Sequence, residues 1–555
     1  MAQRFTGKIA LDVRDSVPDW APYLAPRAPK GSPNVLIVAW DDVGYGAMDV
    51  FGGPIKTPTM QRIADRGVRF GNFHTTALCS PTRASLLTGR NATTTGMATI
   101  AEFASGFPGI STRIPFETAM ISEVLAERGY NTYCVGKWHL TPGEECNVAA
   151  YKGRWPLGRG FERFYGWLGG ETNSYYPDLV HDNHPIEPPA RPEDGYHLAD
   201  DLSNRAIQFI QDAKTIDPDK PFFLYFAPGA THAPIHVPVD WIDRYKGEFD
   251  RGWDAVREET FVRQKQMGII PPDCDLTPRP HGIPAWRDVP DGLKPVLARQ
   301  MEIYAGFLEQ TDHEIGRVVD ALEDLGVLED TLVYYIIGDN GASAEGTPVG
   351  CFNEMAVLNG MGGIETEEFL LSKIDDFGTP NAYNHYAVGW AHALCTPYQW
   401  TKQVASHWGG TRNGTIVHWP RGLADKGTTR NQFHSVIDVA PTILEAAGIP
   451  APLYVNGIQQ APLEGVSMLP TLRDAEADES HRDPVVSALH PAGEQRGSKD
   501  GTGAAHEFST RKFMIRIHSR YHNVSPPEGA CRRGVTARAS RRIRPARSSR
   551  GRRRR

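Results

Sequence analysis

Short apolar runs alternate with longer helical patterns along this 555-residue chain, and this alternation limits the possible folds most strongly. The runs cover residues 34–39, 130–135, 221–226 and 331–337, and helical patterns precede the last three near 118–128, 199–213 and 295–325. Continuous apolar runs are typical of strands that are covered on both faces, as in parallel sheets. The sequence therefore predicts an α/β fold with a large, mostly parallel sheet between helices.

Polar side chains follow four of the predicted strands at the point where each run ends. They are Asp41 with Asp42, Lys137 with His139, His232, and Asp339 with Asn340. Ligands of open α/β sheets bind beyond the carboxyl ends of the strands, so we expect these four groups to converge on one site.

Asp41, Asp42, Asp339 and Asn340 all offer oxygen atoms as ligands. Hard divalent cations such as Ca²⁺ and Mg²⁺ prefer carboxylate and amide oxygens. Each pair taken alone is as well explained by a helix cap or a turn. Their common position after apolar strands favours a metal site.

The run from Cys79 to Arg90 predicts a short helix that starts at a cysteine. Pro81 suits the first turn of a helix, and Gly89 suits its end. The free N–H groups at such a helix start attract anions, and Arg83 lies one helical turn further on the same side. A buried structural cysteine beside a helix start is the alternative interpretation.

The same run resembles the active-site motif of the sulfatase family, Cys-x-Pro-x-Arg followed by Thr-Gly-Arg, and matches all of its fixed positions. The resemblance extends over about residues 33–470 and is strongest to the large bacterial arylsulfatases. It implies an alkaline-phosphatase-like fold with a mixed, mostly parallel sheet between helices and a smaller C-terminal part. It also implies that a formylglycine-generating enzyme oxidises Cys79 to formylglycine, an aldehyde whose hydrate is the nucleophile.

The resemblance assigns the metal ligands to matching positions. By it, Asp41, Asp42, Asp339 and Asn340 bind one Ca²⁺, or Mg²⁺ in its place, together with the residue at Cys79. Asp339 would also serve as the base for the attacking hydroxyl.

The resemblance assigns the remaining site residues as well. By it, Arg83 holds the hydrated aldehyde, and Lys137 and Lys402 contact the sulfate. His139 bonds the hydrate and later accepts its second proton, while His232 donates a proton to the leaving alcohol.

The segments outside the motifs suggest four parts. We expect an irregular N-terminal arm (1–30), the sulfatase catalytic domain (31–472), an incomplete remnant of a C-terminal subdomain (473–530) with one strand at 512–517, and a disordered tail (531–555) with twelve arginines.

Residues 140–195 and 245–295 are rich in Pro, Gly, Trp and Tyr and lack a regular pattern. Long loops in compact domains are usually functional, so we assign both segments to the substrate cleft.

Composition and charge limit the kinds of partner that we expect for this chain. The net charge is −7 even with the arginine tail, so the catalytic domain is acidic and no nucleic acid is expected. No apolar run has the length of a membrane span, and the start of the chain lacks a signal-peptide pattern, so we expect a cytoplasmic protein without a membrane partner. The expected partners are a small-molecule sulfate ester and the formylglycine-generating enzyme. The oligomeric state is not predicted.

These observations predict a sulfuric ester hydrolase that cleaves sulfate monoesters, aryl sulfates foremost, to an alcohol or phenol and inorganic sulfate. Two alternatives stay open. One is a phosphonate or phosphate monoester hydrolase on the same fold, and the other is an inactive sulfatase with a truncated C-terminus.

Overall fold

The computed structural model of the chain describes residues 4–477. The predicted tail at 531–555, the strand at 512–517 and nearly all of the predicted remnant at 473–530 lie outside this range. The described part of the N-terminal arm holds two short 3₁₀ turns, Val13–Asp15 and Ala21–Tyr23, and a bridge between Lys8 and Val17.

A ten-stranded mixed sheet forms the centre of the fold, with the order β11-β2-β10-β9-β1-β8-β4-β5-β6-β7. Five neighbouring strands run parallel: β9 (Thr331–Ile336), β1 (Asn34–Ala39), β8 (Phe222–Ala227), β4 (Asn131–Lys137) and β5 (Arg163–Trp167). On one side, β10 (Thr415–His418) pairs antiparallel with β9 and β2 (Val68–Phe70), and β11 (Thr428–Arg430) pairs parallel with β2. On the other, β6 (Val180–His181) and β7 (His184–Pro185) are antiparallel. The predicted mixed, mostly parallel sheet is confirmed.

Strands β1, β8 and β9 are mainly apolar because both of their faces are covered. Val35 and Ile37 of β1 point into one hydrophobic core, whereas Leu36 and Val38 point into the other. All four side chains are fully buried. Successive side chains of a strand point to opposite faces, so a continuous apolar run supplies both cores at once.

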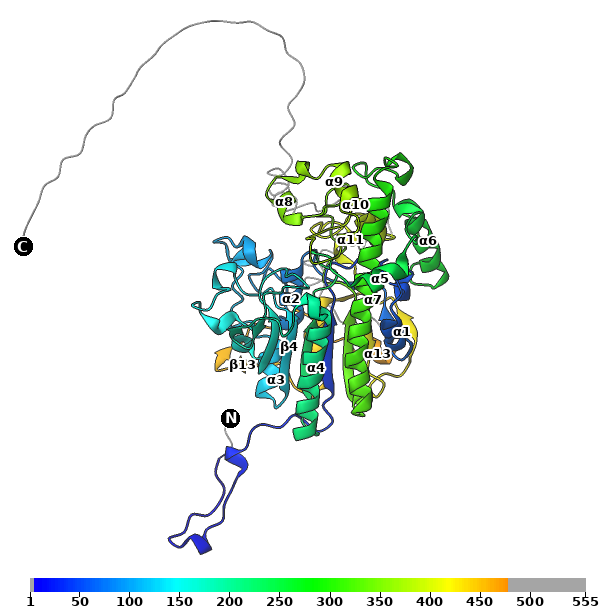
Figure 1. The fold of residues 1–555 in the computed structure, drawn as a ribbon. Coiled ribbons are helices and arrows are strands. Elements are labelled where there is room, and N and C mark those ends of the chain that lie inside the picture. The colour runs from blue at the N-terminus through cyan, green and yellow to red at the C-terminus, as the bar shows by residue number, and fades with distance from the viewer. Residues whose placement is uncertain (1–3, 478–555) are drawn as a thin grey trace, which may run out of the picture. The chain divides into compact units, whose positions relative to one another are not determined.

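Helices cover the two faces of the sheet. The first core contains side chains of α1 (Pro58–Asp65), α4 (Leu198–Ile216), α5 (Val239–Ile242), α6 (Gly252–Gln266), α7 (Lys294–Asp324), α9 (Glu367–Ser372) and α10 (Val388–Leu394). The second contains those of α2 (Cys79–Thr88), α3 (Ile121–Glu127), α12 (Val439–Ala446) and α13 (Leu469–Arg473). Figure 1 shows the long helices α4 and α7 side by side, in keeping with their mutual packing.

Short elements complete the described part of the chain. Two helices, α8 (Glu354–Leu358) and α11 (Trp408–Thr411), lie with α9 and α10 at the top of Figure 1. Two small sheets pair β3 (Phe73–His74) with β12 (His434–Ser435) and β13 (Tyr454–Val455) with β14 (Ile458–Gln459).

The two segments predicted to be irregular contain regular elements, so that prediction was wrong in part. Helix α6 occupies the middle of 245–295, and the edge strands β5 to β7 lie within 140–195. The buried positions of α6 include Trp253, Val256, Thr260 and Gln264, so its inward face is half polar and its periodicity is weak. Strands β6 and β7 have two residues each, too few for a pattern.

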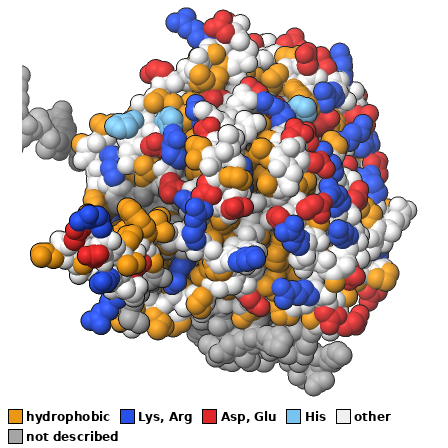
Figure 2. Space-filling view, turned by 90° about the horizontal axis from the view of Figure 1, so that it is seen from below, with side chains coloured by type: hydrophobic (Ala, Val, Ile, Leu, Met, Phe, Trp, Pro, Cys, Tyr) orange, Lys and Arg blue, Asp and Glu red, His pale blue; other side chains and the backbone are white. Residues whose placement is uncertain are grey.

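Within residues 4–477, no helix combines the length and apolar character needed to cross a bilayer. On the face shown in Figure 2, Lys and Arg side chains are interspersed with Asp and Glu side chains.

Asp312 of α7 joins two helices and the sheet. Its fully buried carboxyl group accepts hydrogen bonds from the backbone N–H groups of Thr59 (2.8 Å) and Met60 (3.1 Å), at the start of α1. It also accepts one from the hydroxyl of Tyr335 in β9 (3.0 Å). The first N–H groups of a helix have no partner within the helix, so this side chain satisfies donors that would otherwise be buried unpaired.

We predict that Asp312→Ala lowers the free energy of unfolding by about 2–4 kcal/mol, because three buried donors lose their acceptor together. Urea denaturation at neutral pH measures this loss. Asp320→Ala on the same helix is the matched control, since Asp320 is 55% exposed in a surface ion pair with Arg62 and should change stability by less than about 1 kcal/mol. Equal losses in the two variants would contradict this role of Asp312.

Candidate functional site

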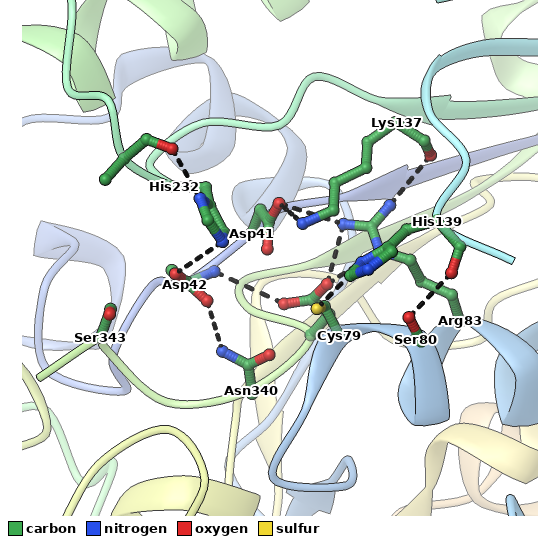
Figure 3. Close-up of polar contacts among 12 residues, drawn as sticks. Asp41, Asp42, Cys79, Ser80, Arg83, Lys137, His139, His232, Asn340 and Ser343 are labelled. Atoms are coloured by element: carbon green, nitrogen blue, oxygen red, sulfur yellow. Dashed lines mark hydrogen bonds and ion pairs between the residues drawn. The ribbon is translucent and has the colours of Figure 1, made fainter. Parts of the chain in front are cut away.

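The polar groups that follow the strands meet at one edge of the sheet. Strands β9, β1, β8 and β4 are consecutive neighbours, and their carboxyl ends carry Asp339, Asp41, His232 and Lys137 respectively. Figure 3 shows Asp41, His232 and Lys137 converging from separate strands around Cys79. All the site residues predicted from the sequence thus lie together in the structure, including Lys402 from a distant loop.

Three carboxylates form the floor of the site. Oxygens of Asp41, Asp42 and Asp339 lie within 4.8 Å of one another, and none of the three residues is more than 1% exposed. Asn340 donates through Nδ2 to Asp42 Oδ1 (2.7 Å), which leaves its own Oδ1 buried without a hydrogen-bond partner among the described residues. Asp41 Oδ1 is likewise buried without a hydrogen-bond partner among the described residues. Such a set of unpaired buried oxygens fits a hard divalent cation.

Each carboxylate of the floor also contacts a basic side chain. Lys137 Nζ lies 2.5 Å from Asp41 Oδ2, and Lys402 Nζ lies 2.9 Å from Asp42 Oδ2. Arg83 Nε donates to Asp339 Oδ2 (3.0 Å). These pairs offset the large cost of removing charges from water, because each buried charge has an opposite charge in contact.

The pKa values of Asp41 and Asp339 are shifted in opposite directions. Burial favours the protonated form of Asp41, but Lys137 and Arg83 hold its pKa well below the usual range. Burial and the neighbouring Asp41 raise the pKa of Asp339 to about 8, in spite of Arg83. The floor therefore retains a proton at neutral pH, and a bound divalent cation would displace it.

Cys79 is the first residue of α2, as the sequence predicts, and is 2% exposed. Gly89 ends this helix in the left-handed conformation (φ 65°). The thiol Sγ lies 3.2 Å from His139 Nδ1. Burial alone would raise the pKa of the Cys79 thiol, but Lys137 and His139 lower it to about 7. The group at position 79 thus lies in surroundings that favour a negative charge.

His139 lies at the same site as Lys137, two residues further along the chain. Lys137 is the last residue of β4, and His139 has left-handed backbone geometry (φ 54°). On its other side, His139 Nε2 lies 2.9 Å from Glu102 Oε2. Burial alone would lower the pKa of His139, but Cys79 and Glu102 raise it to about 9. Glu102 therefore fixes the ring and makes the imidazole a stronger base.

Sequence reasoning missed Glu102 because it lies in a short 3₁₀ turn, Ala101–Phe103, without a motif. Glu345 was missed too, in the loop that follows β9. Its Oε2 accepts a hydrogen bond from Lys402 Nζ (2.8 Å), and Lys402 Nζ also lies 3.2 Å from His232 Nε2. A glutamate four residues beyond the Gly of Asp-Asn-Gly carries no signal by itself.

A cleft opens beside His232. Its lining includes Trp167, Glu171 and Ser174 together with Asp41 and His232. Glu171 and Ser174 belong to the segment 140–195, which the sequence assigned to the substrate cleft. No residue of 245–295 lines this cleft, so that part of the assignment finds no support here.

Comparisons with known proteins agree with this arrangement. The family model described as Sulfatase matches residues 33–449. A Schizosaccharomyces pombe protein described as an uncharacterized sulfatase is 32% identical over 451 residues, which cover 77% of each chain. The arylsulfatase of Klebsiella aerogenes is 28% identical, over 80% of this chain and 93% of that protein. The solved structure of Ps i-CgsB shares the fold, with a TM-score of 0.53 at 21% identity over 80% of this chain and 76% of that one.

The acidic floor predicts stabilisation by a divalent cation. Adding Ca²⁺ to metal-free protein should raise its melting temperature, because a ligand at a hundred times its Kd stabilises the folded state by about 2.7 kcal/mol. Asp339→Ala should abolish this gain, whereas the exposed Asp240→Ala on α5 should keep it. Differential scanning calorimetry measures the gain, and an undiminished gain in Asp339→Ala would place the cation elsewhere.

Proposed function

The chain belongs to the sulfatase family of sulfate ester hydrolases, and we propose that it cleaves aryl sulfates to a phenol and inorganic sulfate. The arylsulfatase of Klebsiella aerogenes, to which the chain is similar over four fifths of its length, supports this choice of substrate. The observation that carries the proposal is the position of Cys79. It lies at a helix start, 3.2 Å from His139, with basic side chains and an acidic floor around it.

We further propose that Cys79 is converted to formylglycine and that Asp41, Asp42, Asp339 and Asn340 hold one Ca²⁺, or Mg²⁺ in its place, with residue 79. When present, the hydrated aldehyde supplies an oxygen nucleophile, and the cation offsets negative charge on the sulfate oxygens. The unpaired oxygens of Asp41 and Asn340 support this assignment.

The basic side chains would bind the sulfate group. Lys137 and Lys402 are buried and held in place by Asp41 and Asp42, so their ammonium groups need no reorganisation when the anion arrives. Arg83 is fixed more firmly still. Its guanidinium donates to Asp339, to the backbone carbonyl of Lys137 (3.1 Å) and to the Tyr225 hydroxyl (3.1 Å).

Two histidines and one aspartate would move protons. Asp339 would accept the proton of the attacking hydroxyl, and His139, held by Glu102, would accept the second proton of residue 79. His232 in its protonated form would donate a proton from Nε2 to the leaving oxygen, while its Nδ1–H stays hydrogen-bonded to the carbonyl of Ala233 (2.7 Å). General acid and base steps of this kind each contribute about 10²–10⁴-fold to the rate.

The charge balance of the site favours sulfate over phosphate. The three basic side chains offset the three floor carboxylates, which leaves the charge of the divalent cation for the substrate and nucleophile. The negative charge of Glu345, which contacts Lys402, reduces this positive charge of the site. A sulfate monoester carries one negative charge, whereas a phosphate monoester is mostly a dianion at neutral pH.

We therefore predict that kcat/KM for 4-nitrophenyl sulfate exceeds that for 4-nitrophenyl phosphate by about tenfold or more, the equivalent of roughly 1.4 kcal/mol in the barrier. Both esters are assayed with one enzyme preparation, and Cys79→Ala serves as the control for contaminating phosphatase. A preference for the phosphate or for a phosphonate ester would overturn the sulfatase proposal in favour of a hydrolase of those esters.

The proposed modification predicts a change at one cysteine. In protein produced together with a formylglycine-generating enzyme, peptide mass spectrometry should find an aldehyde at position 79. Cys79→Ala should abolish turnover with little change in melting temperature, because it removes the nucleophile and no packing of the strands. Cys274→Ser, in a loop outside the site, should remain active. Full activity in protein that contains only unmodified Cys79 would contradict the formylglycine assignment.

A further inference from the structure

A second acidic group lies beside the candidate site. Carboxylate oxygens of Glu345 and Glu354 and a ring nitrogen of His385 lie within 4.8 Å of one another. The side chain of Glu345 is 30% exposed, and it contacts Lys402, so the group adjoins the sulfate-binding side chains. Glu354 and His385 have no part in the proposed chemistry, and Glu345 enters it only through its contact with Lys402.

Glu354 is the residue of this group that lacks a partner. It is 3% exposed at the start of α8, and its Oε2 is buried with no hydrogen bond among the described residues. Burial, together with Glu171 and Glu345, raises the pKa of Glu354 to about 8. Leaving a buried carboxyl oxygen unpaired costs stability, so its position indicates a donor or cation supplied by a ligand.

The other members of the group already have partners. Glu345 Oε2 accepts from Lys402 and from Ser343 (2.9 Å), and Oε1 accepts from Gln403 (2.5 Å). The ring nitrogens of His385 lie near the carbonyl of Tyr386 (3.0 Å) and near Ser343 Oγ (2.9 Å). A metal ion needs several free ligand atoms at once, whereas an organic cation needs only negative potential and one acceptor. The geometry thus favours an organic cation.

Glu171 extends the acidic group toward the cleft. It lines the cleft beside His232, and its Oε1 accepts a hydrogen bond from the Tyr383 hydroxyl (2.9 Å). His232 would protonate the leaving oxygen under the proposed function, so the leaving alcohol or phenol passes this side of the site. The leaving group would therefore face Glu171, Glu345 and Glu354, which we call the acidic wall.

We propose that the acidic wall binds an ammonium group on the alcohol or phenol that the enzyme releases. The inference rests on the proposed function and specifies its substrate class, a sulfate ester that carries a positive charge on the leaving group. The anionic end of such an ester would meet Lys137 and Lys402, and its cationic end would meet the wall. Esters with further negative charges would be repelled.

Binding of matched esters tests the wall separately from turnover. Phenyl sulfates with a 4-trimethylammonium or a 4-carboxylate substituent are titrated calorimetrically into the Cys79→Ala protein, which cannot turn them over. We expect the ammonium ester to bind about tenfold more tightly than the carboxylate ester, a factor typical of one favourable charge contact near a protein surface. In the double variant Cys79→Ala/Glu354→Gln, the ratio of the two binding constants should fall to about threefold or less.

Control variants distinguish the wall from general charge effects. Glu368→Gln removes the same charge from an exposed position on α9 and should leave the binding ratio unchanged. If Glu354→Gln lowers the melting temperature strongly, Glu171→Gln in the partly buried cleft loop carries the same test. Equal binding of the two esters would overturn the inference. A preference for the ammonium ester that persists in both Glu354→Gln and Glu171→Gln would overturn it as well.

Two further measurements separate the remaining possibilities. A bound divalent ion that is lost in Glu354→Gln but kept in Asp339→Ala would make the wall a metal site and would also overturn the inference. Turnover of 4-nitrophenyl sulfate by the modified enzyme reports on the proposed function alone. A failure of that assay leaves the binding ratio of the Cys79→Ala protein as an independent result.

Discussion

The buried ion pairs at the carboxyl edge of the sheet are the interaction on which the site depends. Arg83 reaches from α2 to Asp339 after β9, and Lys137 reaches from β4 to Asp41 after β1. Each of these charges would be costly alone in the interior, and each is tolerated because its partner comes from a different element. The same contacts therefore fix the positions of one helix and three strands relative to one another and place Cys79 among them.

The central sheet could be predicted because its physical demands are visible in the sequence. Strands covered on both faces need continuous apolar runs, and β1, β8 and β9 have them. Edge strands and half-polar helices leave weaker patterns. Strands β6 and β7 are too short to show a period, and the inward face of α6 mixes Trp253 with Thr260 and Gln264. Their positions are set by tertiary contacts that the local sequence does not encode.

The site was predictable to the extent that its residues follow strands. Asp41 and Asp339 follow β1 and β9, which are neighbours, so the rule about strand ends locates them together. Lys402 follows no strand and was assigned only by family resemblance. Glu102 and Glu354 lie in loops or at a short helix start, where a glutamate usually faces water. Only the folded chain shows that they contact or adjoin the site.

Burial of the helix that starts at Cys79 has a consequence for the order of events during biosynthesis. Every residue from Cys79 to Thr88 is buried, and the thiol lies against the ring of His139. Under the proposed modification, the oxidising enzyme would need this segment in its own active site, which the packed helix does not permit. Oxidation of Cys79 would then have to precede the packing of this helix.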